Sequence, residues 1–235
     1  MIYITGDTHR DIDISKLNTR MFPEQKSLTK SDYVIICGDF GMVWDNSNTD
    51  LYWRKWLDDK PWTTLFIDGN HDNHSLIYAF PEVDMFDGKV RKVSDSIYYL
   101  QRGQVFNIDG KSILAIGGAD SVDKEWRLQY QRETGEQIWW ESEQISEYDI
   151  LLAMNAVQHN YDGVIDIVIS HAAPYFIEKQ IGEYIKHTPS SRLLGYLAQQ
   201  IKFNAWYFGH YHTDASFTDE FGCKYTGLYQ NVQLI

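Results

Sequence analysis

Short apolar runs recur along the chain, separated by turn residues and by segments of helical periodicity. Apolar runs of this length, bounded by glycine or by polar residues, are typical of buried strands. Six such strands are predicted, at residues 2–5, 33–37, 64–67, 112–116, 165–170 and 205–208. The segment FNIDGKSI contains an Asp109-Gly110 pair, which favours a tight hairpin turn, and residues 216–229 show the pattern of a second hairpin.

Helical patterns lie between several of these runs, at residues 51–59, 146–161 and 188–203. The second pattern begins with Ser146 and Asp149, which have the spacing of a capping box. The third offers Thr188 as an N-cap and Pro189 in the first helical turn. Proline is tolerated there because an N–H at that position would have no partner within the helix. Strands that alternate with helices indicate an α/β architecture.

Residues 120–149 differ from both patterns. They contain nine acidic and three basic residues, together with Trp126, Trp139 and Trp140. We interpret this segment as part of a helical insert, at about residues 120–160, that lies over or beside the sheets. Its tryptophans either anchor a solvated helical excursion or form a wall of the substrate site.

Length and composition indicate one folded domain that spans residues 1–235. Hydrophobic residues make up 43% of the chain, which is enough for a substantial core. No apolar run approaches the roughly 20 residues that cross a bilayer, and the opening MIYITGDTHR lacks the features of a signal peptide. Cys37 and Cys223 are expected to be ordinary thiols in a reducing compartment. We therefore expect a cytoplasmic protein.

The formal net charge of −12 changes the range of partners to consider. It disfavours a broad electrostatic grip on nucleic acid, because such binding depends on lysine and arginine neutralising phosphates. Carboxylates that bind metal ions would weaken this argument against nucleic acid, because the bound ions would cancel part of the negative charge.

Potential metal ligands follow five of the six predicted strands. The carboxyl ends of strands gather at one edge in α/β folds, so residues far apart in the sequence are expected to converge. These residues are Asp7, His9, Asp39, Asn70, His71, Asp72, His171, His210 and His212. Their oxygen and nitrogen donors suit Mn, Fe or Zn. One carboxylate can bridge two ions, and two ions close together can clamp a phosphate ester.

The pair His210 and His212 is informative through its spacing. In a strand, side chains at positions i and i+2 point to the same side, so both rings would face one pocket. Two histidines placed in this way have an immediate use if each serves a different metal ion. The preceding Gly209 lets the backbone turn tightly at such a pocket.

The blocks GDTH, GD, GNHD, SH and GHYH occur in this order, each after an apolar run. The ordered set, from Gly6 to His212, resembles the calcineurin-like metallophosphoesterase superfamily and its small bacterial and phage members. A single GD or GNH block is weak evidence, but the five blocks together cover nearly the whole chain. The resemblance implies an α/β fold of four layers, an αββα sandwich in which two mixed β-sheets are flanked by helices.

The resemblance also implies a role for each strand-end residue. One divalent ion would be held by Asp7, His9 and His212, and a second by Asn70, His171 and His210. Asp39 would bridge the two ions, which we expect to be Mn²⁺, with Fe or Zn²⁺ as alternatives. His71 would be a catalytic histidine that binds no metal. Asp72 would orient it, although a carboxylate in this position also fits a loop-capping role.

Several features depart from the common family pattern. Arg10 stands where glycine is usual, and it either points toward substrate phosphate or is solvated. The segment GDFGMVWD lacks the arginine of the DRG motif, which disfavours a protein serine/threonine phosphatase. The segment GGADSVDKEWR carries Lys124 and Arg127, which either bind substrate phosphate or form surface ion pairs. His74, close to GNHD, is not needed as a ligand because the ligand set is already complete.

These features predict a phosphoesterase in which a hydroxide held between two metal ions attacks phosphorus while His71 protonates the leaving oxygen. The expected substrate is a phosphate monoester or diester, on a small molecule or a nucleotide, and no membrane partner is expected. The alternatives are a nucleotide or dinucleoside polyphosphate hydrolase, a nuclease, which the acidic composition disfavours, and a non-catalytic metal-binding scaffold.

Overall fold

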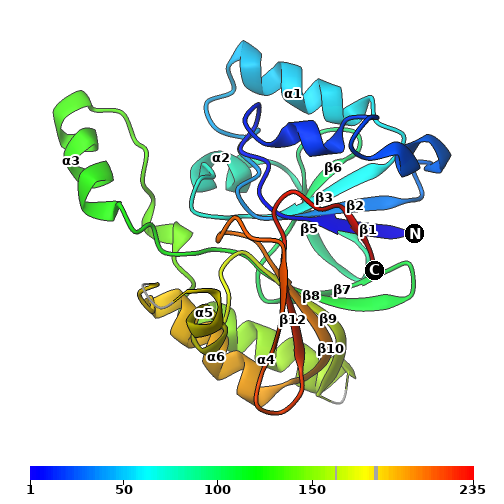
Figure 1. The fold of residues 1–235 in the computed structure, drawn as a ribbon. Helices are drawn as coiled ribbons and strands as arrows, with labels where there is room; N and C mark the ends of the chain where they lie inside the picture. Colours follow the sequence, from blue (N-terminus) through cyan, green and yellow to red (C-terminus); the bar gives the residue numbers. More distant parts are fainter. Residues whose placement is uncertain (162, 183–184) are drawn as a thin grey trace.

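Two mixed β-sheets lie face to face with helices on their outer sides (Figure 1). The computed structural model describes residues 1–161, 163–182 and 185–235. The first sheet, sheet A, has the strand order β13 (Gln233–Leu234), β1 (Ile2–Thr5), β2 (Tyr33–Cys37), β3 (Thr63–Ile67), β6 (Ile97–Leu100), β5 (Gly88–Lys92) and β4 (Glu82–Met85). Its central strands β1, β2, β3 and β6 are parallel, and the strands at its two margins are antiparallel to their neighbours.

The second sheet, sheet B, has the order β11 (Ala215–Thr218), β12 (Lys224–Gly227), β10 (Lys202–Phe208), β9 (Val164–Ser170), β8 (Lys111–Ile116) and β7 (Gln104–Ile108). Strands β8, β9, β10 and β12 are parallel, while β7 and β11 are antiparallel to their neighbours. The helices are α1 (Asn48–Asp58), α2 (His74–Ala79), α3 (Lys124–Thr134), α4 (Glu147–Tyr161), α5 (Tyr175–Ile181) and α6 (Pro189–Gln200).

Three hydrophobic clusters fill the spaces between the four layers. They are distinct because alternate side chains of a strand point to opposite faces of its sheet, as strand β2 illustrates. Ile35 and Cys37 join residues of both sheets in the central cluster, whereas Val34 and Ile36 face the layer that contains α1 and α2. A third cluster joins the outer face of sheet B to α4, α5 and α6. The αββα sandwich expected from the sequence is therefore confirmed.

All six predicted strands are present, and most begin within a residue or two of the predicted position. The Asp109-Gly110 hairpin joins β7 to β8, with both residues at positive φ, 49° and 77°, as a type I′ turn requires. The segment 216–229 contains the β11–β12 hairpin. The helix predicted at 188–203 ends at Gln200, because the following residues begin β10.

The range predicted as a helical insert has two parts in the structure. Residues 120–146, which we call the arm, carry α3 well away from the two sheets (Figure 1). Helix α4 instead packs on sheet B, where Ile150, Ala153 and Val157 belong to the outer hydrophobic cluster. Helix α4 is thus one of the four layers, and only the arm stands apart from them.

The base of the arm is attached to sheet A by a buried arginine. Arg102 follows β6 and pairs with the buried Asp68, which follows β3. The same guanidinium donates hydrogen bonds to the carbonyl oxygens of Ser142 and Gln144, both at 2.9 Å. No helix among the described residues has the length and apolar character needed to cross a membrane.

Candidate metal centre

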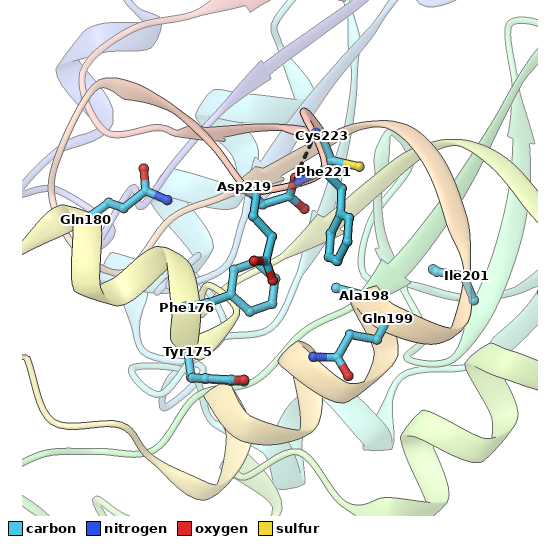
Figure 2. A pocket seen from close by; sticks show the side chains of 10 residues that line it. Tyr175, Phe176, Gln180, Ala198, Gln199, Ile201, Asp219, Phe221 and Cys223 are labelled. Carbon is cyan, nitrogen blue, oxygen red and sulfur yellow. Dashed lines mark hydrogen bonds between the residues drawn. The ribbon is translucent and has the colours of Figure 1, made fainter.

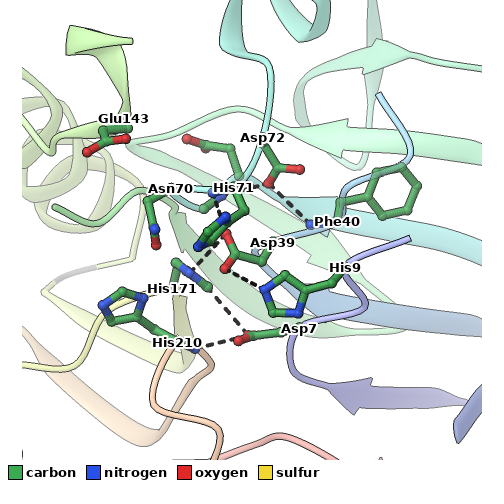
Figure 3. A network of polar contacts seen from close by, with 12 residues as sticks. Asp7, His9, Asp39, Phe40, Asn70, His71, Asp72, Glu143, His171 and His210 are labelled. Carbon is green, nitrogen blue, oxygen red and sulfur yellow. Dashed lines mark hydrogen bonds and ion pairs between the residues drawn. The ribbon is translucent and has the colours of Figure 1, made fainter. Parts of the chain in front are cut away.

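The carboxyl ends of the parallel strands of both sheets meet at one edge of the sandwich, and the predicted ligands gather there. Figure 3 shows all of them except His212. From sheet A, Asp7 lies two residues beyond β1, Asp39 two residues beyond β2 and Asn70 three residues beyond β3. From sheet B, His171 directly follows β9 and His210 lies two residues beyond β10. Strand direction therefore brings together residues that span most of the chain.

Asp7, His9 and His212 form one group whose potential ligand atoms all lie within 4.8 Å of one another. The Nε2 atom of His212 is 3.1 Å from Oδ2 of Asp7. Asp7 is fully buried, whereas the side chain of His212 is 49% exposed. This group therefore lies on the solvent side of the centre.

Asp39, His171 and His210 form a second group within the same distance limit. The Nε2 atom of His171 is 3.2 Å from Oδ1 of Asp39, and its Nδ1 atom is 2.8 Å from the carbonyl oxygen of Cys37. That backbone contact directs Nε2 into the centre. Gly69 permits the arrangement, since a Cβ atom there would collide with Asp39 Oδ1 and His171 Nε2.

Asp39 connects the two groups. Its Oδ2 atom is 3.1 Å from Nε2 of His9, and its Oδ1 atom is 3.2 Å from Nε2 of His171. Each oxygen thus faces a histidine of a different group. Asp39 also belongs to a third cluster of potential ligands, together with His9 and His71.

Several buried donor atoms fit a metal ion better than they fit a purely protein environment. Oδ2 of Asp7, Oδ1 of Asn70 and Nε2 of His171 are all buried without a hydrogen-bond partner among the described residues. His212 lies near the first of these atoms and Asp39 near the last, but neither contact has the geometry of a hydrogen bond. Such atoms normally find partners in folded proteins. All three belong to predicted ligands, and none is a thiolate, which matches the donor preferences of Mn, Fe or Zn.

The charges of the site point to a cation as well. Burial opposes ionisation of Asp39, but His171 and His9 beside it hold the pKa of its carboxyl well below the usual value. Burial favours neutral His171, but the Asp39 carboxylate raises the pKa of His171 to about 10. Partial burial and the His171 cation lower the pKa of His210 to about 4. Without metal, a proton on His171 balances part of the carboxylate charge. A bound metal ion would take over this role, because a ligating histidine must be neutral.

Four predicted ligands have left-handed backbone conformations. The φ angles are 41° at His9, 47° at Asp39, 67° at His210 and 48° at His212. Positive φ is uncommon outside glycine and costs of order 1–3 kcal/mol, so it persists where the surrounding structure imposes it, commonly at functional sites. The expected strand geometry of His210 and His212 is wrong, because β10 ends at Phe208. The two rings reach the centre from a tight loop instead.

Residues 1–214 match the family model of the calcineurin-like phosphoesterases. The chain belongs to this family. Among solved structures, phosphopantetheinyl hydrolase from Mycobacterium tuberculosis is 12% identical, with 97% of this chain and 89% of that chain covered and a TM-score of 0.44. A protein of unknown function from Aquifex aeolicus is 17% identical, with 86% and 87% covered and a TM-score of 0.34. A comparison with curated proteins found no match.

In this member of the calcineurin-like phosphoesterase family, His71 lies at the exposed side of the centre. Its backbone N–H donates to Oδ1 of Asp39 at 2.8 Å, and its ring centroid is 5.4 Å from that of His9. Partial desolvation and the nearby Arg127 cation lower the pKa of His71, while the Asp39 carboxylate opposes this. Its ring contacts the guanidinium of Arg127 rather than a carboxylate.

Asp72 has a different position from the expected orienting partner of His71. It is fully buried, and its oxygens accept hydrogen bonds from the backbone N–H groups of Gly69, Phe40 and Gly41 at 2.8, 3.2 and 2.8 Å. Among the described residues it makes no hydrogen bond with the His71 ring. The loop-capping alternative fits this geometry, because both oxygens already hold the loops that follow β2 and β3.

Of the three basic residues expected to bind substrate phosphate, one reaches the centre and two do not. Arg127 contacts His71 through Nη2. Lys124 instead places its Nζ atom 4.3 Å from the ring centroid of Trp139. Arg10 donates to Asp50 at 3.1 Å and to Asp11 at 3.3 Å, so two carboxylates already neutralise it.

Sequence analysis missed the residues that support the ligands from behind. Oδ2 of Asp13 is 2.7 Å from Nδ1 of His9, and its Oδ1 accepts from the hydroxyl of Tyr229 at 3.0 Å. The Tyr229 ring stacks on His212, with centroids 4.5 Å apart. Such partners hold ligating histidines in one orientation. The spacing of four residues between His9 and Asp13 is a weak signal, and Tyr229 offers none.

The arm supports Asn70 in a similar way. Nδ2 of Asn70 is 3.5 Å from the hydroxyl of Ser121, which donates to the buried Glu143 at 2.8 Å. This leaves Oδ1 of Asn70 facing the centre. The remaining histidines lie elsewhere. His74 is buried near Asp68, His159 contacts the carbonyl oxygen of Asn155, and His187 contacts the carboxylate of Glu178.

A separate cavity of about 860 Å³ lies between α5, α6 and the turn of the β11–β12 hairpin (Figure 2). Tyr175, Phe176 and the exposed Phe221 line it, together with Asp219, which accepts a hydrogen bond from the backbone of Cys223. None of the predicted site residues is among the described residues that line it. This cavity is therefore separate from the candidate metal centre.

Proposed function

We propose that the protein is a phosphoesterase that uses two divalent metal ions. The observation that carries the proposal is the position of Asp39 between His9 and His171, with one oxygen toward each. In the proposed centre, Asp39 bridges the ions, one ion is held by Asp7, His9 and His212, and the other by Asn70, His171 and His210. We propose Mn²⁺ as the metal, with Fe or Zn²⁺ as alternatives, because the donors are nitrogen and oxygen atoms.

The reaction follows from the chemistry of these groups. When bound, the ions supply Lewis-acid activation of a phosphate ester and of an attacking water. His71 is exposed, lies beside the Asp39 oxygen and is held by its backbone N–H. It can therefore donate a proton to the leaving oxygen of a substrate bound at the rim, as a general acid does. Because a water would attack phosphorus directly, the proposed reaction would need no covalent enzyme intermediate.

The proposed substrate is a phosphate monoester or diester on a small molecule or a nucleotide. The net charge of −12 weighs against long nucleic acid strands, which need many cationic contacts. The open, partly exposed rim at His71 and His212 gives a phosphate group access to the centre. We also propose a cytoplasmic location, which the two free thiols support.

Replacement of the bridging residue tests the proposal. Asp39→Asn keeps the size of the side chain but removes the charge that both ions share, so we expect it to bind less metal at both positions and to lose hydrolysis. Metal content of the purified protein, by mass spectrometry, and rates with p-nitrophenyl phosphate and bis-p-nitrophenyl phosphate are the measurements. Asp59→Asn, in an exposed aspartate after α1, is the control. Two equivalents of metal and normal rates in Asp39→Asn would overturn the proposal.

A further inference from the structure

Arg127 is a buried arginine that the arm delivers to the rim of the centre. Only 4% of its surface is exposed. Its Nε atom donates to Oδ1 of Asp123 at 2.8 Å, and its Nη1 atom donates to the carbonyl oxygen of Asn70 at 3.0 Å. These two bonds hold the guanidinium from the arm side and from the GNHD loop. The third nitrogen, Nη2, is left facing the centre.

Among the residues that the structure describes, the Nη2 atom has no strong acceptor. It lies 3.2 Å from Nδ1 and 3.1 Å from Nε2 of His71. An atom equally close to both ring nitrogens can avoid the carbon between them only by lying above the ring plane. The lone pairs of imidazole lie in the ring plane, so the guanidinium stacks on His71 without a directed bond from Nη2. The N–H groups of Nη2 are therefore available to a better acceptor.

The charge balance around Arg127 favours an anionic acceptor. The Asp123 side chain, its carboxylate partner, is 43% exposed, so solvent screens that pair. Lys124, the other cation at the start of α3, lies over Trp139 instead. A fixed guanidinium whose remaining N–H groups face a phosphoryl-transfer centre matches the geometry of phosphate recognition by arginine.

We propose that Arg127 binds an unesterified oxygen of the substrate phosphate and thereby makes the enzyme selective for monoesters over diesters. This inference rests on the proposed phosphoesterase function. A monoester has one more unesterified oxygen than a diester. Above its second pKa, near pH ~6, it also carries about one more negative charge. The fixed cation therefore stabilises a bound monoester more than a bound diester.

The test compares two esters in the metal-loaded full-length protein. Arg127→Ala is expected to lower kcat/KM for p-nitrophenyl phosphate by about 10- to 100-fold, the range for one lost hydrogen bond to a charged group. The loss for bis-p-nitrophenyl phosphate should be much smaller. Arg127→Lys, which keeps the charge without the planar fork, should recover part of the monoester activity. Arg132→Ala, an exposed arginine in the last turn of α3, should match the parent protein.

A structural role gives a different pattern. If Arg127 only anchors the arm to the GNHD loop, Arg127→Ala and Arg127→Lys lose metal or lose both ester activities equally, and the selectivity proposal is overturned. Binding of inorganic phosphate to the Mn²⁺-loaded protein, by titration calorimetry, gives a readout without turnover. Weaker phosphate binding in Arg127→Ala is expected, and unchanged binding overturns the proposal. If the parent protein hydrolyses neither ester, the proposed function fails, and the phosphate titration still decides the role of Arg127.

Discussion

Three consecutive residues of the GNHD segment have three different environments. Oδ1 of Asn70 is buried without a hydrogen-bond partner and faces the centre. The His71 side chain is exposed beside Arg127. Asp72 is buried on backbone N–H groups of two loops. The turn after β3 separates these side chains, so neighbouring positions can serve as ligand, proton donor and loop cap.

The substitution His71→Ala tests whether His71 acts as a proton donor or as a metal ligand. We expect the variant to keep its metal and to lose about 10²–10⁴-fold in kcat on a substrate with a poor leaving group, because general acid catalysis contributes about that much. The loss should be smaller with p-nitrophenyl phosphate, whose leaving group departs without a proton. Metal analysis and turnover of both substrates are the measurements. His159→Ala is the control, since His159 is exposed on α4 and its ring is hydrogen-bonded to the carbonyl oxygen of Asn155.

Two outcomes of this experiment would contradict the assignment. Loss of metal from His71→Ala would make His71 a ligand, which its grouping with His9 and Asp39 also permits. Equal losses on both substrates, with metal retained, would mean that His71 positions phosphate and donates no proton.

At the residue scale, sequence reasoning identified which side chains converge but not how they are held. Asp7, Asp39 and His171 were predictable because each follows a buried apolar run. For Asp72 the loop-capping role was only the alternative to an orienting role, because its partners Phe40 and Gly41 lie about thirty residues away in the chain. Positive φ at His210 and His212 likewise results from packing in the centre, and nothing in the local sequence requires it.

At the scale of elements, the buried strands were predictable and the marginal strands of sheet A were not. Strands β4 and β5, with the sequences EVDM and GKVRK, are short, charged and partly exposed. Strand β4 alternates in exposure, as an antiparallel edge strand does, and in β5 only Val90 is buried, so few apolar residues mark either strand. Strand β6 is apolar, but its parallel pairing with β3 follows the excursion through α2, β4 and β5. Pairing over such a distance leaves no local signal.

The tryptophans of the arm differ in a way that composition did not reveal. Trp140 is 6% exposed and meets Trp44 edge to face, with ring centroids 5.4 Å apart. Trp126 is 59% exposed and lies near Tyr130 on α3. Trp140 therefore anchors the base of the arm to the loop before α1, whereas Trp126 belongs to the outer part of the arm.

Trp140→Ala is expected to destabilise the protein by about 3–5 kcal/mol, the usual loss for a buried tryptophan. Trp126→Ala should change the free energy of unfolding by less than about 0.5 kcal/mol, as surface substitutions usually do. Equilibrium unfolding in urea, followed by circular dichroism, measures both. Equal effects of the two substitutions would show that Trp140 does not anchor the arm.

At the scale of the whole molecule, the centre joins the two sheets. Asp7, Asp39 and Asn70 come from the edge of sheet A, and His171 and His210 come from the edge of sheet B. The α/β class was predictable from alternating strands and helices. The division into two sheets was predictable only through the family resemblance, because strand pairing between distant segments has no local signature.

Removal of metal should therefore lower the stability of the entire fold. An ion that binds only the folded chain contributes about 2.7 kcal/mol when its free concentration is about 100 times its Kd. For a chain of this size each kcal/mol shifts Tm by about 2–4 °C, so each Mn²⁺ ion bound in this way should raise Tm by roughly 5–11 °C over protein treated with EDTA. Asp39→Asn should lose most of this shift, and Asp59→Asn should retain it. Differential scanning calorimetry measures the shifts. An equal shift in Asp39→Asn would mean that the stabilising ions bind away from the centre, and no shift in the parent protein would mean that the folded chain holds no metal there.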